Sequence, residues 1–289
     1  MQKEKIIPFV KKQRRFIGLA ILLITGFLFF YYLKTHPDVL NPIKNIPTFL
    51  LIFLLLLYGV FLLVGTFITK ITILMCREKY GFDDSLQLTI YSTLVNFFGP
   101  LQSGPGFRAL YLKNKLEIRI RDYTAVTSVY YMSFLVISLL MLFGPKYPIF
   151  ALLVILLAVS LYIRYFRKSN NKSIFFKWVL ILSAMTALQI LIVAVIYYFE
   201  LAALGYHANL SSILIYAGSA NLALFVSFTP AAIGIRESFI YFSQSMHDIP
   251  TEYIFNTSLL DRSVYLMFLI ILLAFSSSLH LKAKLIKSK

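Results

Sequence analysis

The sequence predicts an all-α polytopic membrane protein, and three observations carry that prediction. Of 289 residues, 59% are hydrophobic and 14% charged, against about 45–50% apolar residues in soluble domains. The mean hydropathy is +0.79, and long apolar runs recur along the chain. Lys and Arg residues cluster in alternate connections between these runs, which is typical of membrane proteins that follow the positive-inside rule.

Six apolar runs are candidates for full transmembrane helices. A crossing helix needs about 20 residues to span a hydrocarbon core of ~30 Å. Five runs approach or exceed this length, and the shorter fourth run is followed by Tyr165 and Phe166, aromatic residues that favour the membrane interface. The first run follows a basic segment but lacks a small-x-small cleavage motif, so we interpret it as a retained signal anchor. The six runs are 16–33, 47–69, 123–143, 148–163, 178–199 and 253–279.

The distribution of positive charge orients these helices. Of 28 Lys and Arg residues, 22 lie in the segments 1–15, 70–85, 113–121, 164–177 and 282–289. This asymmetry predicts that both termini are cytoplasmic, in the inner or plasma membrane. It also accounts for the net charge of +16 without a nucleic-acid partner.

An apolar segment with basic residues on both sides must enter the membrane and return to the same face. Its first limb, 86–98, would form roughly 20 Å of helix, which is too short to cross. Pro100 and Gly104 then break the helix, since Pro removes a hydrogen bond and Gly permits turn dihedrals. We therefore predict a re-entrant helical hairpin with its tip in the membrane.

A second hairpin is predicted over 212–242, entering from the opposite face. Its flanks lack Lys and Arg, and its tip, FTPAAIGIRESF, contains Pro230 and Gly234. Because irregular backbone is unstable against lipid, both tips should be covered by protein or line a polar cavity. The alternative is that 212–228 is an ordinary crossing and the tip is a cytoplasmic loop.

The two halves of the chain, 1–145 and 146–289, have the same order of two spans, a hairpin and a span. Three crossings per half is an odd number, so the second half should be inverted. The tips FGPLQSG and FTPAAIG share Phe-x-Pro-x-x-x-Gly. We predict one integral membrane domain, 1–289, of about eight apolar segments arranged as inverted repeats, the architecture of secondary transporters.

Five charged residues remain at membrane depth: Arg108, Arg236, Glu237, Asp261 and Arg262. A charge at a helix centre costs about 2.5–3.5 kcal/mol, so these residues should face a cavity or one another. Adjacent helical residues do not pair well, so Arg236 and Glu237 should find partners on another element, such as the last span. Either these are structural ion pairs, or the surplus arginine binds an anionic head group such as phosphate.

Other chemistry has little support in the sequence. The single Cys76 excludes an internal disulfide, and four scattered histidines show no metal-ligand spacing, so we expect neither a metal nor a cofactor. No P-loop, GxSxG or HExxH motif occurs, so any catalysis would depend on Glu237 or Asp261 as general base. Polar residues of the hairpins are candidates for helix caps or head-group ligands: Asn96, Gln102, Ser103, Asn221, Ser227 and Thr229.

The two tips resemble those of the lysylphosphatidylglycerol synthase transmembrane-region family. The motifs are Pro-x-x-x-Gly-x-Arg-Glu, ending at Arg236 and Glu237, and Pro-x-x-x-Gly-x-x-x-Arg, ending at Arg108. The resemblance implies that these residues and Arg262 line a head-group cavity between the halves. In that family the membrane domain occurs alone or fused to a soluble aminoacyl-transferase domain in the multiple peptide resistance factor, where it flips the aminoacylated lipid. Archaeal relatives are linked to hexose transfer from a dolichol-phosphate carrier.

The sequence departs from that family pattern in two respects. Pro105 stands where an acidic residue often follows the tip glycine, and 123–143 contains no Glu-Arg pair. The soluble transferase domain is also not in this sequence, so we do not expect this chain to make lysylphosphatidylglycerol alone.

The leading hypothesis is a translocase that moves a phosphate-containing lipid, aminoacylated or polyprenyl-linked, between leaflets. The rival is a head-group or sugar transferase that uses a polyprenyl-phosphate donor. A third possibility is an accessory subunit of a separately encoded synthase or glycosyltransferase. The expected partners are membrane lipids with anionic head groups; the oligomeric state is left open.

Overall fold

The protein is all-helical in the part of the chain that the structure describes. The computed structural model describes residues 46–98, 103–167, 172–226, 232 and 234–287. The first predicted span, 16–33, lies outside these ranges. The ten helices are Thr48–Met75 (α3), Phe82–Phe98 (α4), Ser103–Leu116 (α5), Ile120–Phe143 (α6), Pro148–Arg167 (α7), Lys172–Ala203 (α8), Leu210–Val226 (α9), Ile235–Phe242 (α10), Gln244–His247 (α11) and Thr251–Lys287 (α12).

Four of these helices are long and apolar enough to cross a membrane: α3, α6, α8 over Phe176–Ala203 and α12 over Thr251–Phe275. The chain is therefore a multi-pass membrane protein. Helix α7 was predicted as a full span; it forms, and its described apolar part is the shorter Pro148–Ala158. Several helices extend beyond the predicted apolar runs: α3 continues to Met75 and α12 to Lys287.

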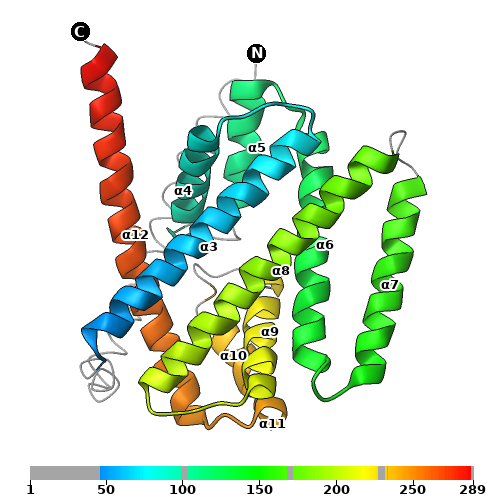
Figure 1. Cartoon of the computed structure of the whole chain (residues 1–289), viewed down its shortest axis with the longest axis vertical. Coiled ribbons are helices and arrows are strands. Elements are labelled where there is room, and N and C mark those ends of the chain that lie inside the picture. The colour runs from blue at the N-terminus through cyan, green and yellow to red at the C-terminus, as the bar shows by residue number, and fades with distance from the viewer. Residues whose placement is uncertain (1–45, 99–102, 168–171, 227–231, 233, 288–289) are drawn as a thin grey trace, which may run out of the picture.

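Helices α4 and α5 pack against each other as a helical hairpin at the upper end of the molecule (Figure 1). The Ser103 hydroxyl at the start of α5 donates a hydrogen bond of 2.9 Å to the carbonyl of Val95 on α4. The backbone amide of Gly104 donates to Oδ1 of Asn96, at 3.3 Å. These bonds satisfy two polar groups at the end of the hairpin, where a broken helix leaves backbone groups without partners.

The position of Gly104 corrects its predicted role as a turn residue. Gly104 and Pro105 lie in the first turn of α5, where Pro is tolerated because its missing N–H would have no helical partner. A Cβ on Gly104 would meet the Ser92 carbonyl oxygen at 2.6 Å and Asn96 Cβ at 2.9 Å. The glycine thus allows close packing of α5 on α4, and the break itself, 99–102, lies outside the described residues.

Helices α9 and α10 form a second pair at the lower end of the molecule, opposite α4 and α5 (Figure 1). The Ser219 hydroxyl on α9 donates a 2.7 Å bond to the carbonyl of Phe239 on α10, and the Ser243 hydroxyl donates to Ser219 at 2.9 Å. Gly234 precedes α10 with φ of +82°, a backbone conformation that glycine adopts without strain. Gly234 therefore stands at the start of α10, and the rest of the predicted tip, 227–231 and 233, lies outside the described residues.

The long helices pack around these pairs. Helix α3 lies beside α8 across the middle of the molecule, and α12 packs against both (Figure 1). Leu54, Leu182 and Val264 are among the buried residues of this junction. Helix α9 packs on α6 and α8 through small residues, including Ala217 and Ala220, which are buried completely or almost completely. Small side chains permit the close backbone approach that stabilises helix pairs in membranes.

Candidate functional site

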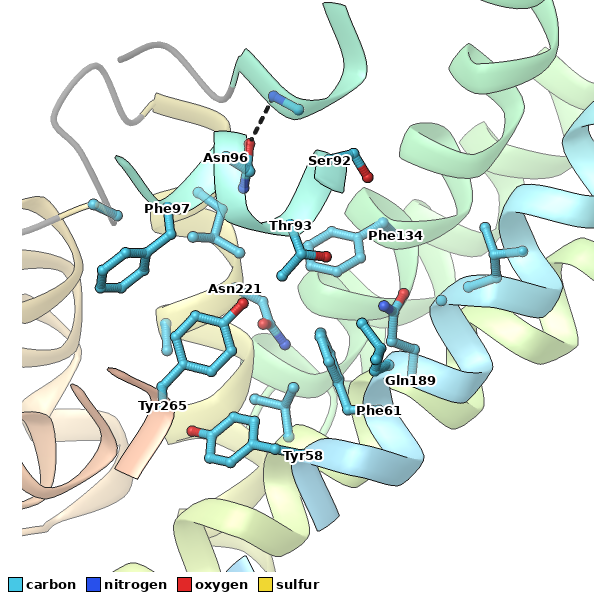
Figure 2. Close-up of a pocket in the computed structure, with 18 of the residues that line it drawn as sticks. Tyr58, Phe61, Ser92, Thr93, Asn96, Phe97, Phe134, Gln189, Asn221 and Tyr265 are labelled. Carbon is cyan, nitrogen blue, oxygen red and sulfur yellow. Dashed lines mark hydrogen bonds between the residues drawn. The ribbon is translucent and has the colours of Figure 1, made fainter. Parts of the chain in front are cut away.

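A cavity of about 300 Å³ lies between the two helical pairs and brings together residues from both. The α4–α5 pair contributes Asn96, Gly104 and Arg108, and the α9–α10 pair contributes Asn221 and Arg236. The remaining walls come from the long helices α3, α6, α8 and α12. Figure 2 shows Asn221, Tyr265, Tyr58 and Gln189 around this space. Of the five predicted binding residues, four line the cavity: Arg108, Arg236, Asp261 and Arg262.

Arg236 and Asp261 form a buried ion pair between α10 and α12. Their side chains are 14% and 9% exposed. The second carboxylate oxygen of Asp261 accepts a hydrogen bond from the Tyr58 hydroxyl on α3, and Arg236 Nη1 donates to the Tyr197 hydroxyl on α8 at 3.3 Å. The pair therefore joins four helices at one point, and Arg236 has its partner on the last span, as predicted.

Arg262 and Glu237 form a second buried ion pair between the same two helices. Arg262 Nε donates to Oε1 of Glu237 at 3.1 Å, while Oε2 of Glu237 accepts the backbone N–H of Gly234 at 2.8 Å. Glu237 thus caps the start of α10 and holds Arg262 at the cavity wall. Glu237 itself is not a lining residue; it supports one.

Arg108 is the cavity arginine without a carboxylate partner in the part of the chain that the structure describes. It lies on α5, and its Nη1 donates to the Thr69 hydroxyl on α3 at 3.2 Å. The aromatic residues Tyr130 and Tyr131 on α6 line the same region of the cavity. A neutral hydroxyl does not balance a guanidinium charge, so Arg108 carries a positive charge that the described residues do not neutralise.

The fully buried, unpartnered side-chain atoms of the described lining residues are all N–H donors. Most buried hydroxyls are satisfied inside their own helices; Thr66, for example, donates to the carbonyl of Leu62 at 2.9 Å. Among the lining residues described, the buried side-chain atoms without a hydrogen-bond partner are Nε of Arg108, Nδ2 of Asn221 and Nε of Arg236. Buried donors without acceptors are costly, so the cavity is suited to a ligand rich in acceptor oxygens.

Aromatic and amide side chains form the rest of the wall. The Tyr130 hydroxyl donates to Oε1 of Gln189 at 3.0 Å, which joins α6 to α8. Tyr58 and Tyr265 lie against each other, with ring centroids 5.1 Å apart. Figure 2 places Phe61, Phe97 and Phe134 around the same space. The wall thus combines apolar ring surface with hydroxyl and amide groups, as in sites for organic ligands with polar head groups.

Glu200 is a buried carboxylate that the sequence reasoning missed. It is 0% exposed, near the end of α8, and neither carboxylate oxygen has a hydrogen-bond partner among the described residues. It lies within electrostatic reach of Asp261 and Arg236. The sequence signal is that Glu200 directly follows the apolar run 178–199, where helix α8 continues to Ala203.

Some candidate residues cannot be placed. Pro100, Gln102, Ser227, Thr229 and Pro230 lie outside the described residues. Ser103 serves the helix pair α4–α5 and not the cavity. Among the residues described, no group of three His, Cys, Asp or Glu side chains is placed to hold a metal ion.

The comparison with known families gives one match. A family model described as "Lysylphosphatidylglycerol synthase TM region" matches residues 15–274, which is most of the chain. It covers both helical pairs and every charged residue of the cavity. No curated protein and no solved structure matches the chain.

Proposed function

We propose, from the premise that this chain belongs to the lysylphosphatidylglycerol synthase transmembrane region family, that it moves a phosphate-containing lipid between the two leaflets of a membrane. The membership covers most of the chain and supports a membrane protein with a lipid-related role. The lipid head group would occupy the cavity between α5 and α10, and the acyl or prenyl chains would remain in the bilayer.

The observation that carries this proposal is the set of unpaired donors on the cavity wall. Arg108, Arg236 and Asn221 each have a buried N–H without an acceptor, and Arg108 has no carboxylate partner among the described residues. A phosphate group offers acceptor oxygens for the unpaired N–H groups and a negative charge that balances the charge of Arg108. A zwitterionic or neutral head group would leave the charge of Arg108 less well balanced.

The arrangement of the two helical pairs supports movement across the membrane. The α4–α5 and α9–α10 pairs lie at opposite ends of the molecule and meet the same cavity (Figure 1). We propose that they are re-entrant hairpins of two inverted repeats, 1–145 and 146–289, with both termini in the cytoplasm of an inner or plasma membrane. In such architectures a central site is opened to each side in turn.

The contacts of the two carboxylates predicted as candidate bases, Asp261 and Glu237, favour a translocase over a transferase. Asp261 is held by Arg236 and Tyr58, and Glu237 by Arg262 and the Gly234 amide. A general base must be free to accept a proton from substrate, and a carboxylate in a charge-assisted pair is a poor acceptor. A subunit of a separately encoded synthase would need the same head-group cavity but would not be expected to move lipid on its own.

The test is translocation of fluorescent phosphatidylglycerol in proteoliposomes, followed by the loss of fluorescence when a membrane-impermeant reductant is added. We expect the wild type to expose inner-leaflet probe faster than protein-free vesicles. Arg108→Gln removes the charge but keeps a polar side chain. Loss of a charge-assisted bond of about 1.5–3 kcal/mol should reduce phosphatidylglycerol movement about tenfold to hundredfold.

Lys113→Gln is the matched control, because Lys113 is an exposed cation on the same helix. It should move the probe at the wild-type rate, and both variants should unfold at the wild-type temperature. Equal rates for wild type and Arg108→Gln, above empty vesicles, would remove Arg108 from the mechanism. No movement by the wild type would refute the translocase and leave the transferase or subunit hypotheses.

A further inference from the structure

The carboxyl group of Glu200 is shielded from solvent and has no hydrogen-bond donor among the described residues to stabilise a negative charge. Its side chain is fully buried, and both oxygens lack partners in the described part of the chain. An isolated ionised carboxylate in an apolar interior is very costly, whereas its protonated form is neutral and costs far less. This acid is not needed for the ion pairs, because Arg236 and Arg262 already have carboxylate partners.

The surroundings of Glu200 connect it to the cavity. The groups within its electrostatic reach are Tyr58 on α3, Tyr216 on α9, Arg236 on α10 and Asp261 on α12, besides Tyr197 on its own helix. Four of these line the cavity: Tyr58, Tyr197, Arg236 and Asp261. The charge state of Glu200 therefore acts on the ion pair at the cavity wall.

The buried charges can be balanced in two ways. Three arginines, Arg108, Arg236 and Arg262, face the carboxylates of Glu237 and Asp261 and the acid group of Glu200. With Glu200 ionised the set is neutral; with Glu200 protonated it carries one positive charge. A head group with a single negative charge restores neutrality only in the protonated case, and net charge is costly in a low-dielectric interior.

We propose that Glu200 is a proton-binding site, and that the protein binds one proton together with one anionic lipid head group. The inference rests on the proposed function, and it names the ion that accompanies the lipid. No covalent step is involved: the proton moves from solvent to a carboxylate oxygen of Glu200. A proton gradient across the membrane would then bias the direction in which the lipid moves.

The linkage has a defined sign. Because the protonated form favours the head group, affinity is greatest at low pH and falls as pH rises past the point at which Glu200 loses its proton. For one linked proton the decrease approaches about tenfold per pH unit. A phosphodiester keeps its single charge over this range, so the probe itself does not titrate.

The experiment is calorimetric titration of the purified full chain, in zwitterionic nanodiscs, with a short-chain phosphatidylglycerol. Each titration is repeated in two buffers with different ionisation enthalpies, so that protons taken up per lipid bound are measured directly. We expect uptake that approaches one proton in the wild type and none in Glu200→Gln, whose affinity should be independent of pH. Glu252→Gln, which changes an exposed acid in the first turn of α12, should retain the wild-type uptake.

The outcomes separate this inference from the function on which it rests. Lipid binding by the wild type with no proton uptake between about pH 5 and 9 would overturn the proton site and leave the head-group site intact. No binding by the wild type would overturn both. Should Glu200→Gln fail to fold, Glu200→Asp keeps the acid and is expected to retain uptake, and the wild-type titration still decides the question. Unchanged uptake in a folded Glu200→Gln would assign the proton to another group and overturn the inference.

Discussion

The close packing of α5 on α4 gives the sharpest structural test, the substitution Gly104→Ala. The added Cβ would lie 2.6 Å from the Ser92 carbonyl oxygen and 2.9 Å from Asn96 Cβ. The first distance is about 0.8 Å short of the 3.4 Å at which ordinary contact begins. The atom in the way is a backbone oxygen of α4, which cannot turn aside as a side chain can. Helix α5 must therefore move away from α4, and overpacking of this kind typically costs about 1–3 kcal/mol.

The displacement has a functional consequence because Arg108 lies one helical turn beyond Gly104. A shift of nearly 1 Å at Gly104 is passed to Arg108, which bonds Thr69 at 3.2 Å and lines the cavity. A misplacement of about 1 Å can reduce the rate of a positioned step about a hundredfold. We expect lower unfolding temperature and slower lipid translocation together.

Gly106→Ala is the matched control on the same helix. A Cβ at Gly106 would meet nothing within 4 Å. Since Ala is favoured over Gly in a helix by up to about 1 kcal/mol, this variant should be slightly more stable than the wild type and should move lipid normally. The assays are thermal unfolding in detergent and translocation in proteoliposomes. Equal stability of the two alanine variants would refute the packing argument.

Two further predictions concern buried polar contacts. Asp261→Asn leaves the Arg236 guanidinium without a counter-charge and should reduce the free energy of unfolding by about 3–5 kcal/mol, whereas Arg236→Met with Asp261→Leu should recover much of the loss; equal stability of all variants in thermal unfolding would show that the pair is not structurally coupled. Burial lowers the pKa of His247, whose Nδ1 accepts the Ile249 N–H at 3.0 Å and whose Nε2 bonds the Ile240 carbonyl. The unfolded chain therefore takes up the proton first, so the contribution of His247 to stability is intact above about pH 6.5 and is lost as pH falls through the lowered value, by about 0.5–1.5 kcal/mol for one bond. Unfolding temperatures at pH 7.5 and pH 5 should differ more in the wild type than in His247→Gln, and an equal difference would contradict this account.

The spans could be predicted from the length of each apolar run, and the ion pairs from the small number of charged residues at membrane depth. A long apolar run needs no tertiary information to be recognised as a crossing helix. Arg236 and Glu237 could be assigned partners on the last span because buried charges require them, and Asp261 and Arg262 were the charges available. Family membership followed from the spacing of the tip motifs.

The parts that escaped prediction depend on packing. Gly104 was expected in a turn but lies in helix α5. Glycine is needed there because the backbone of Ser92 on α4 comes close, and no local sequence pattern reveals that contact. Glu200 follows an apolar run, and whether such a residue faces solvent or the interior depends on which helices cover it. Gln189 was not predicted to line the cavity for the same reason, since a single polar residue in a span is more often structural.

The central claim is that the cavity between the two helical pairs holds the phosphate of a lipid head group. The most direct measurement is an experimental structure of the protein in nanodiscs that contain phosphatidylglycerol. We expect head-group density inside the cavity, with phosphate oxygens within hydrogen-bond distance of Arg108 and near Asn221 and Arg236. A cavity filled by acyl chain, with the head group outside it and Arg108 still bound to Thr69 alone, would contradict the account.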